Sequence, residues 1–353
     1  ANALQSLGIQ LGDRVGTLAW NDHRHFELYY AISCSGAICH TVNPRLFPEQ
    51  LVYIINHAED RVIFCDPMFV PLLENIQDQL EFIEHVIVLT SEDQMPSSSL
   101  SNLLCYETLI AEQSDVYEWP KFDEKTASAM CYTSGTTGNP KGVVYHHRGA
   151  YLMATGSSVA WNMPNKLNFL CVVPMFHCNG WCYPWTLAML HARIICLRNI
   201  DIKKMFELID KYEVTHFGGA PIVLNMIVNA PKEDQKALKR KVNVLTAGAP
   251  PPSIIFEKME NLGFEVMHVY GLTEKLPIEE SQTPIPLTNH DNNKLQSEKF
   301  LEIASHEKII DSVSLRLSNV YGPSLNESSA SDRGILSKIT KMCFENKTIP
   351  LYG

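Results

Sequence analysis

A loop rich in glycine and in hydroxyl side chains lies near the middle of the chain. It reads TSGTTGNPKG over residues 133–142 and follows an apolar strand that ends at Tyr132. Glycines allow backbone N–H groups to face inward as a nest for an anion, and the hydroxyls supply further donors. Lys141 adds one mobile positive charge. The loop suits a triphosphate, although its spacing is not that of a Walker A loop. The alternative is a polar surface turn.

Two further segments carry residue types that suit the same chemistry. Residues 247–250 read AGAP after an expected strand, where small side chains let a flat ring approach the backbone. Alone, this segment is an ordinary strand-to-helix turn. Residues 269–274 read VYGLTE, and the Thr273 hydroxyl and Glu274 carboxylate are oxygen ligands of the kind that a hard cation prefers. This Thr-Glu pair has little meaning without the other segments.

One histidine stands out among apolar residues. Residues 173–181 read VPMFHCNGW, so His177 lies between Phe176 and the expected start of a glycine-containing helix. A histidine beside apolar residues is usually a satisfied core side chain. The alternative is a histidine that faces a ligand.

In this order, the segments resemble the signature motifs of the adenylate-forming superfamily, which comprises the acyl-CoA synthetases and their relatives. The resemblance covers about residues 4–274. It implies that the loop holds the phosphates of ATP, that residues 247–250 hold adenine and that Tyr270 packs on adenine. The residues implied for nucleotide binding are Thr133, Ser134, Gly135, Thr136, Thr137, Gly138, Lys141, Gly248, Ala249, Pro250, Tyr270, Gly271 and Thr273.

The same resemblance implies a reaction. A carboxylic acid, fatty or short-chain, is activated with ATP to an acyl adenylate and then transferred to the thiol of coenzyme A. Lys141, His177, Thr273 and Glu274 are the implied catalytic residues, with His177 between the nucleotide and the acyl tunnel. Thr133 and Glu274 are implied as holders of Mg²⁺. The expected partners are the acid, ATP and coenzyme A.

A candidate wall for the acyl group follows from the resemblance. Residues 217–221 read FGGAP, and their glycines make room for a chain. Trp181, Tyr183 and Trp185 could line the same pocket. The alternative, ordinary core aromatics, is equally compatible with the pattern.

The resemblance to the ligases stops after Glu274. The ribose-binding aspartate, the hinge and the small lysine-bearing domain that the family implies have no match downstream, and no Gly-Asp pair occurs there. Residues 314–323, SLRLSNVYGP, instead resemble the NAD-dependent nucleotide-sugar epimerases and dehydratases. There Lys294 matches a Tyr-x-x-x-Lys lysine, but His290 occupies the tyrosine position.

These observations predict a chimera of a truncated adenylate-forming domain, residues 1–274, and an epimerase-like fragment, residues 275–353. The junction is expected between residues 269 and 274, because both families use VYG at a strand end. Two alternatives to an active ligase stay open: a catalytically inactive chimera, or a non-catalytic module that binds nucleotide. A working epimerase is a weaker alternative, because the glycine-rich NAD loop is absent from the sequence.

The elements that position these segments alternate between short apolar runs and helix-like stretches. Strands are expected at residues 15–20, 37–42, 61–65, 85–90, 169–174, 193–197, 242–247, 264–270 and 313–320. Helices are expected at residues 22–35, 48–57, 201–212, 252–262, 293–308 and 331–346. This rhythm predicts an α/β fold, with parallel sheets flanked by helices and ligands at the carboxyl ends of the strands.

The amino-acid composition disfavours some classes of protein and partner. The 353 residues include 29 Lys and Arg against 39 Asp and Glu, a net charge of −10 that disfavours a nucleic-acid partner. The sequence contains no run of about 18 apolar residues that could span a membrane, and its first twenty residues have neither the basic start nor the apolar core of a signal peptide. The 10 cysteines lack a Cys-x-x-Cys pair and are expected to be reduced, mostly buried thiols of a cytoplasmic protein. The pattern does not indicate an oligomeric state.

Overall fold

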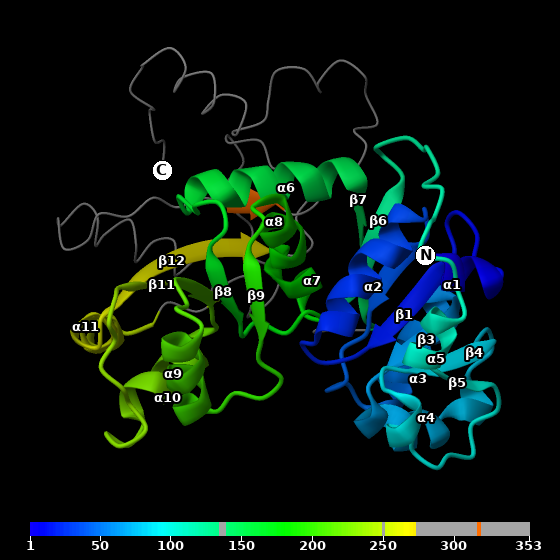
Figure 1. The fold of residues 1–353 in the computed structure, drawn as a ribbon, viewed down its shortest axis with the longest axis horizontal. Helices are drawn as coiled ribbons and strands as arrows, with labels where there is room; N and C mark the ends of the chain where they lie inside the picture. Colours follow the sequence, from blue (N-terminus) through cyan, green and yellow to red (C-terminus); the bar gives the residue numbers. More distant parts are fainter. Residues whose placement is uncertain (134–138, 249–250, 273–315, 319–353) are drawn as a thin grey trace.

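Strands and helices alternate along nearly all of the described chain, and the strands assemble into two sheets (Figure 1). The computed structural model describes residues 1–133, 139–248, 251–272 and 316–318. The expected α/β architecture, with parallel sheets flanked by helices, is confirmed.

The first sheet gathers the strands of the amino-terminal part of the chain. Neighbouring strands pair in parallel except for the last pair, in which β7 runs antiparallel to β6. In spatial order its seven strands are β5 (Leu103–Cys105), β4 (His85–Val88), β3 (Asp60–Cys65), β1 (Arg14–Leu18), β2 (Ile38–Thr41), β6 (Ala127–Thr133) and β7 (Lys141–His146).

The second sheet is parallel throughout the described pairs. In spatial order its six strands are β13 (Arg316–Ser318), β12 (Phe264–Leu272), β11 (Val242–Ala247), β10 (His216–Gly218), β8 (Asn168–Cys171) and β9 (Arg193–Cys196).

Helices cover both sheets. They are α1 (Asn2–Ser6), α2 (His23–Cys34), α3 (Pro48–Ala58), α4 (Val70–Glu74), α5 (Tyr106–Ala111), α6 (His147–Ala160), α7 (Cys178–Trp181), α8 (Tyr183–Met189), α9 (Ile202–Lys211), α10 (Pro221–Asn229) and α11 (Ser253–Asn261). Short 3₁₀ turns occur at Pro67–Phe69, Gln77–Gln79 and Glu92–Gln94. The last of these turns lies in the polar stretch between β4 and β5.

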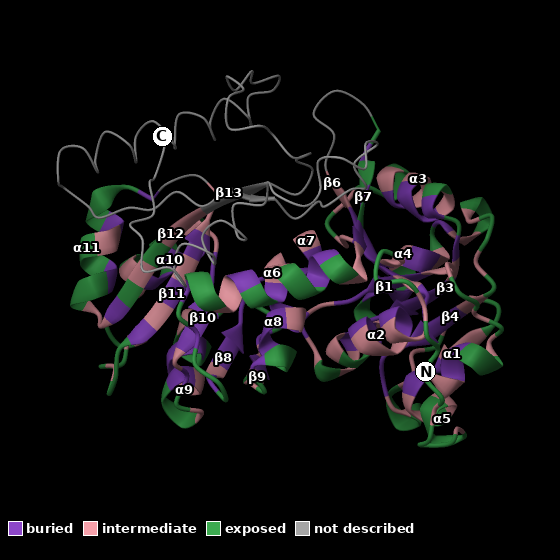
Figure 2. Cartoon of the chain, turned by 90° about the horizontal axis from the view of Figure 1, so that it is seen from above, coloured by how far each residue is buried: buried purple, intermediate pink, exposed green. Residues whose placement is uncertain are grey.

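Successive side chains of a strand point to opposite faces of the sheet, so they pack into different hydrophobic cores. In β3, Val62 and Phe64 join a cluster with α2 and α8 that also contains Phe169 of β8, so this core connects the two sheets. Ile63 of the same strand instead packs under α3 and α4. A third cluster joins the other face of the second sheet to α9, α10 and α11. In Figure 2 the strands are accordingly mostly buried and the outer helices have exposed faces.

Most expected elements are found near their expected bounds. The strand at residues 242–247 matches β11, and α2 begins after Asp22, whose side chain accepts a hydrogen bond from the Arg24 backbone N–H. One strand departs from the parallel arrangement, because β7 runs antiparallel beside β6. The connection between the two strands is too short for the crossover of a dozen or more residues that a parallel pair needs.

The epimerase-like tail contributes one described strand. Of the strand expected at residues 313–320, the structure describes Arg316–Ser318 as β13, which pairs in parallel with β12 so that Arg316 lies opposite Tyr270. The helices expected at residues 293–308 and 331–346 lie outside the described residues. The tail therefore extends the second sheet at the edge where residues 269–272 end β12.

The described cysteines agree with the expectation of mostly buried thiols. Of the nine in the described ranges, six are buried. Burial raises the pKa of several of these thiols, among them Cys39, whose pKa is raised to about 12. None of the helices in the described ranges has the length and apolar character needed to cross a membrane.

Candidate active site

The glycine-rich loop connects β6 to β7, and both of its ends are fixed by strand pairing. Thr133, the last residue of β6, lies opposite Lys141, the first residue of β7. The Thr133 hydroxyl is buried and has no hydrogen-bond partner within the described part of the chain, whereas Lys141 is exposed. Ser134, Gly135, Thr136, Thr137 and Gly138 lie outside the described residues. An orphaned hydroxyl beside a free ammonium is the arrangement expected where an oxyanion binds.

The loop's donor set suits a phosphate and its counter-ion better than a metal alone. Within the described ranges, no group of three His, Cys, Asp or Glu side chains is placed to hold a metal ion. The Thr133 hydroxyl offers one of the two oxygens implied for Mg²⁺. The other implied holder, Glu274, lies outside the described residues.

His177 immediately precedes an unusual left-handed turn. Five consecutive residues have positive φ, from 47° at Cys178 through 61° at Gly180 to 63° at Cys182. A left-handed conformation costs about 1–2 kcal/mol per non-glycine residue, so the surrounding packing must hold this turn in place. The glycine-containing helix expected after His177 is present as α7, which contains Gly180 but turns with left-handed backbone angles, and the right-handed helix α8 begins at Tyr183.

Side chains from the first sheet hold the backbone that leads to His177. Asn21, which follows β1, donates from Nδ2 to the carbonyls of Cys171 and Val173 at 2.9 and 3.1 Å, and its Oδ1 accepts from the N–H of Met175 at 2.8 Å. The hydroxyl of Tyr29 donates to the Met175 carbonyl. One buried asparagine thus fixes three backbone groups of the segment between β8 and α7.

A third contact ties the turn itself to the strand pair below the loop. The Thr41 hydroxyl of β2 lies 3.2 Å from the Phe176 carbonyl and 3.1 Å from Asn179 Oδ1, both able to accept its proton. Thr133 ends β6, and His177 directly precedes α7. Because β2 pairs with β6 and α7 contacts β6, His177 and Thr133 belong to neighbouring elements of the fold.

The segments expected to hold adenine meet at the carboxyl ends of β11 and β12. Ala247 lies opposite Val269, so Gly248 and Tyr270 follow adjacent strand positions. Gly248 has φ of 110°, and among the described residues the neighbour that a Cβ there would meet is Pro221 Cδ, at an ordinary contact distance of 3.8 Å. Gly271 lies within β12. Ala249, Pro250, Thr273 and Glu274 lie outside the described residues.

The aromatic cluster divides between core and surface roles. Tyr183 is buried in the core that connects the sheets, and its ring covers Gly218 so closely that a Cβ there would lie 2.7 Å from Tyr183 Cε2. Gly218 therefore makes room for this tyrosine, which favours the core alternative for Tyr183. Trp181 and Trp185 are half-buried at the edge of the same core.

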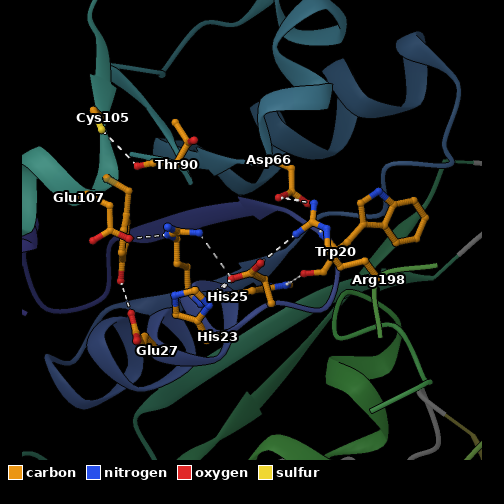
Figure 3. Close-up of polar contacts among 12 residues, drawn as sticks. Trp20, His23, His25, Glu27, Asp66, Thr90, Cys105, Glu107 and Arg198 are labelled. Atoms are coloured by element: carbon orange, nitrogen blue, oxygen red, sulfur yellow. Dashed lines mark hydrogen bonds and ion pairs between the residues drawn. The ribbon is translucent and has the colours of Figure 1, made fainter. Parts of the chain in front are cut away.

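An ionic cluster that sequence reasoning missed joins the ends of several strands (Figure 3). Arg198, which follows β9 of the second sheet, reaches Asp22 at 3.0 Å and Asp66 at 2.9 Å in the first sheet. Asp66 is 1% exposed and also accepts from the Trp20 N–H at 2.7 Å. These partners are far apart in the sequence, so no local spacing could have revealed them.

The buried His25 beside this cluster predicts acid sensitivity. Its ring is fully buried between the Trp20 carbonyl and the Thr17 hydroxyl, and burial lowers its pKa to about 4. The folded protein therefore keeps the ring neutral, while the unfolded chain takes up a proton below about pH 6.5. The neutral His25 ring therefore contributes fully to the free energy of unfolding above that pH, and this contribution is lost as the pH falls toward 4. We expect denaturant unfolding to show a loss of about 2 kcal/mol between pH 7 and pH 5.

His23 supplies the control for this effect. It lies two residues away on α2 but has a side chain that is 65% exposed. A His23→Gln variant should keep the pH dependence, and His25→Gln should reduce it, with the remainder due to His216, whose pKa burial also lowers to about 4. A wild-type stability that is constant between pH 7 and pH 5 contradicts the assignment.

With this geometry established, comparison with known proteins assigns the family. The chain belongs to the AMP-binding enzyme family, whose model matches residues 1–297. The model of the NAD dependent epimerase/dehydratase family matches residues 267–353. The two matches overlap over residues 267–297, which include the expected junction at 269–274.

Curated relatives are acyl-CoA ligases. The chain is 42% identical over 298 residues to 3-methylmercaptopropionyl-CoA ligase of Ruegeria lacuscaerulensis, covering 82% of this chain and 54% of the relative. It is 36% identical over 342 residues to medium-chain-fatty-acid–CoA ligase of Ectopseudomonas oleovorans, covering 96% of this chain and 62% of the relative. The peroxisomal acetate/butyrate–CoA ligase AAE7 of Arabidopsis thaliana is 41% identical over 288 residues, covering 78% of this chain and 50% of the relative. The chain thus spans between half and two thirds of their length.

Solved structures share the fold. The anthranilate CoA ligase AuaEII in complex with anthranoyl-AMP superposes with a TM-score of 0.69 at 24% identity, over 77% of this chain and 52% of that one. The N-terminal domain of FACL13 from Mycobacterium tuberculosis superposes with a TM-score of 0.67 at 22% identity, over 77% and 66% of the two chains. The described fold is that of the amino-terminal part of such ligases.

Proposed function

We propose that this chain carries the nucleotide-binding part of an AMP-forming acyl-CoA ligase. The observation that carries the proposal is the orphaned Thr133 hydroxyl paired across the hairpin with the exposed Lys141, at the two ends of a glycine- and hydroxyl-rich loop. Membership in the AMP-binding family supports the same assignment. The proposed ligands of the loop are the phosphates of ATP.

In the first proposed step, an oxygen of the substrate carboxylate attacks the α-phosphorus of ATP. A new P–O bond forms, the bond to the β-phosphate oxygen breaks, and pyrophosphate leaves. Both reactants are anions, so the barrier falls when their charge is offset and their approach is aligned. Lys141 and the loop N–H groups offset the charge, and the Thr273 hydroxyl donates to the α-phosphate.

In the second proposed step, the thiol sulfur of coenzyme A attacks the acyl carbonyl carbon and loses its proton. The C–O bond to phosphate breaks and AMP leaves. In this proposal His177 lies between the nucleotide and the acyl tunnel, where its side chain acts as a gate that controls access of the thiol. Gly248, Ala249, Pro250, Tyr270 and Gly271 hold the adenine.

Mg²⁺ is the proposed metal, held by the Thr133 hydroxyl and the Glu274 carboxylate. When bound, it supplies positive charge that offsets the phosphates. The orphaned hydroxyl fits this role, because a buried hydroxyl without a partner is costly unless a ligand satisfies it.

The proposed acid is short to medium in chain length. The names of the curated relatives support this class, since they specify 3-methylmercaptopropionyl, medium-chain-fatty-acid and acetate/butyrate substrates. The mostly buried described cysteines and the lack of a Cys-x-x-Cys pair support the proposal of a cytoplasmic location, and the net charge of −10 argues against a nucleic-acid partner.

A second candidate function is a catalytically inactive chimera that still binds nucleotide. The observation that favours it is the match of residues 267–353 to the NAD dependent epimerase/dehydratase family. We propose that residues 1–274 form the adenylate-forming domain and residues 275–353 the epimerase-like fragment. A working epimerase is disfavoured, since His290 replaces the required tyrosine.

ATP–pyrophosphate exchange separates the two candidates. The chain is incubated with ATP, Mg²⁺ and labelled pyrophosphate, together with acids from acetate to decanoate. Exchange that depends on a short or medium acid supports the ligase. Calorimetric binding of ATP·Mg²⁺ without exchange supports the inactive module. If the chain shows no binding and no exchange, both candidate functions are rejected.

A further inference from the structure

A buried histidine–aspartate pair lies on the face of the first sheet that α3 covers. His40 of β2 and Asp60 of β3 are both 0% exposed, and His40 Nδ1 lies 2.6 Å from Asp60 Oδ2. Burial raises the pKa of Asp60, against the opposing effects of His40 and Arg14. None of the motifs assigned to the ligase reaction includes either residue.

The pair spans a strand that lies between its two members. In the sheet, β1 separates β3 from β2, and Gly16 of β1 lies opposite His40. A Cβ on Gly16 would lie 3.2 Å from Asp60 Oδ2 and 3.1 Å from Ile63 Cγ1. The Asp60 side chain therefore passes over Gly16 to reach His40, and the absence of a side chain at this position makes the contact possible.

The contacts of the Asp60–His40 pair continue from His40 to β6, the strand that leads into the glycine-rich loop. The His40 ring packs against Tyr132 of β6 with centroids 5.2 Å apart, and the Tyr132 hydroxyl lies 2.7 Å from His57 Nδ1 on α3. Burial raises the pKa of Tyr132, so its hydroxyl stays protonated and can donate to or accept from the His57 ring. Four consecutive strands, β3, β1, β2 and β6, thus contribute to one row of contacts that ends next to Thr133.

A second glycine accommodates the same tyrosine on the return strand. Gly142 of β7 lies opposite Tyr132, and a Cβ there would lie 3.2 Å from Tyr132 Cζ and 3.3 Å from Met130 Cε. The ring therefore lies across the hairpin one position before the Thr133–Lys141 pair. Any movement of Tyr132 must be transmitted to the two residues that flank the loop.

Fold stability alone does not account for the buried pair. His40 Nε2 and Asp60 Oδ1 are buried without a hydrogen-bond partner within the described ranges. Burying a hydrogen-bonded polar pair is costly unless its remaining polar atoms are also satisfied, and apolar residues of similar size often stabilise a core better. The pair instead supplies a directional contact that fixes where the His40 ring, and hence Tyr132, can lie.

We propose that Asp60, His40, Tyr132 and His57 form a positioning row that sets the spacing and orientation of Thr133 and Lys141 at the phosphate-binding loop. The inference rests on the proposed function of that loop. These four are positioning residues, because none of them is argued to touch ATP.

Tyr132→Phe tests the row with the smallest change in packing. The variant keeps the ring between His40 and Gly142 but removes the hydroxyl that bonds His57. We expect the KM for ATP in pyrophosphate exchange, and the calorimetric Kd for ATP·Mg²⁺, to rise about 10-fold, while kcat and the KM for the acid stay within about twofold. A merely structural role would lower the apparent kcat and the binding stoichiometry through the fraction of folded protein, and would leave the KM and Kd for ATP unchanged.

Tyr106→Phe is the matched control. Tyr106 also donates a 2.7 Å hydroxyl hydrogen bond to a side chain, Glu27, but it lies beside β5 at the opposite end of the sheet. It should leave the ATP affinity at the wild-type value. His57→Ala should weaken ATP binding as Tyr132→Phe does, and the double variant should be no worse than either single variant, because both remove the same contact.

The outcomes separate this inference from the function on which it rests. If wild type binds no ATP·Mg²⁺, the proposed function fails. If wild type binds ATP·Mg²⁺ but Tyr132→Phe and His57→Ala bind it equally well, the loop holds nucleotide and the positioning row is rejected. Additive effects in the double variant also contradict the row, since they require two independent contacts.

Discussion

Alanine in place of Lys141 is expected to lower kcat/KM for ATP–pyrophosphate exchange by at least about 100-fold. Lys141 is the exposed first residue of β7, directly across the hairpin from Thr133. Its ammonium is the mobile charge at the end of the loop, so its loss leaves the triphosphate less neutralised as negative charge moves toward the leaving pyrophosphate. The Kd for ATP·Mg²⁺, measured by calorimetry, should also rise.

Lys125→Ala provides the control for net charge. Lys125 is likewise exposed and lies shortly before β6, outside the loop. Its removal changes the total charge equally and should alter the exchange rate less than about twofold, since exposed surface charges interact weakly through solvent. Equal losses in the two variants would show that long-range attraction of the nucleotide, rather than contact at the loop, explains the effect.

The largest expected effect on stability comes from Asn21→Ala. Asn21 is 2% exposed, and its amide satisfies the carbonyls of Cys171 and Val173 and the N–H of Met175. Truncation removes one hydrogen bond from each of these three backbone groups, and only the Cys171 carbonyl keeps a backbone partner, the Leu197 N–H at 3.2 Å. The loss should cost about 3 kcal/mol in the free energy of unfolding. Because the same backbone leads to His177, activity at saturating ATP should also fall in the fraction that remains folded.

Asn56→Ala separates this effect from a general loss of asparagine hydrogen bonds. Asn56 of α3 donates to the Gln79 carbonyl at 2.8 Å and accepts from the Glu81 N–H at 3.0 Å, but both contacts are exposed to solvent. Water can replace these contacts, so urea unfolding should show a loss below about 1 kcal/mol. If Asn21→Ala costs no more than Asn56→Ala, the segment before His177 is not held by Asn21.

Local patterns predicted most strands and the helices between them. The run at residues 242–247 forms β11 with those bounds, and Asp22 caps α2 as its residue type indicates. Such elements were predictable because apolar alternation and capping depend on neighbours in the sequence. The loop at residues 133–142 was likewise found from its residue types, and both of its described ends lie in paired strands.

Other features depend on contacts between distant residues. The antiparallel pairing of β7 and the ion pairs of Arg198 with Asp22 and Asp66 could not be predicted from spacing, because strand register and ion pairing are decided by packing. The left-handed turn after His177 was predicted as a helix start, since its pattern does not distinguish the two hands. The Asp60–His40 pair was missed because the glycine that permits it belongs to a third strand.

The central claim is that the loop between β6 and β7 holds the phosphates of a bound nucleotide. A crystal structure of the chain with Mg²⁺ and a non-hydrolysable ATP analogue tests it most directly. The expected result places phosphate oxygens within hydrogen-bond distance of loop N–H groups, the Thr133 hydroxyl and Lys141 Nζ. A complex in which the loop faces solvent and the nucleotide binds elsewhere contradicts the account.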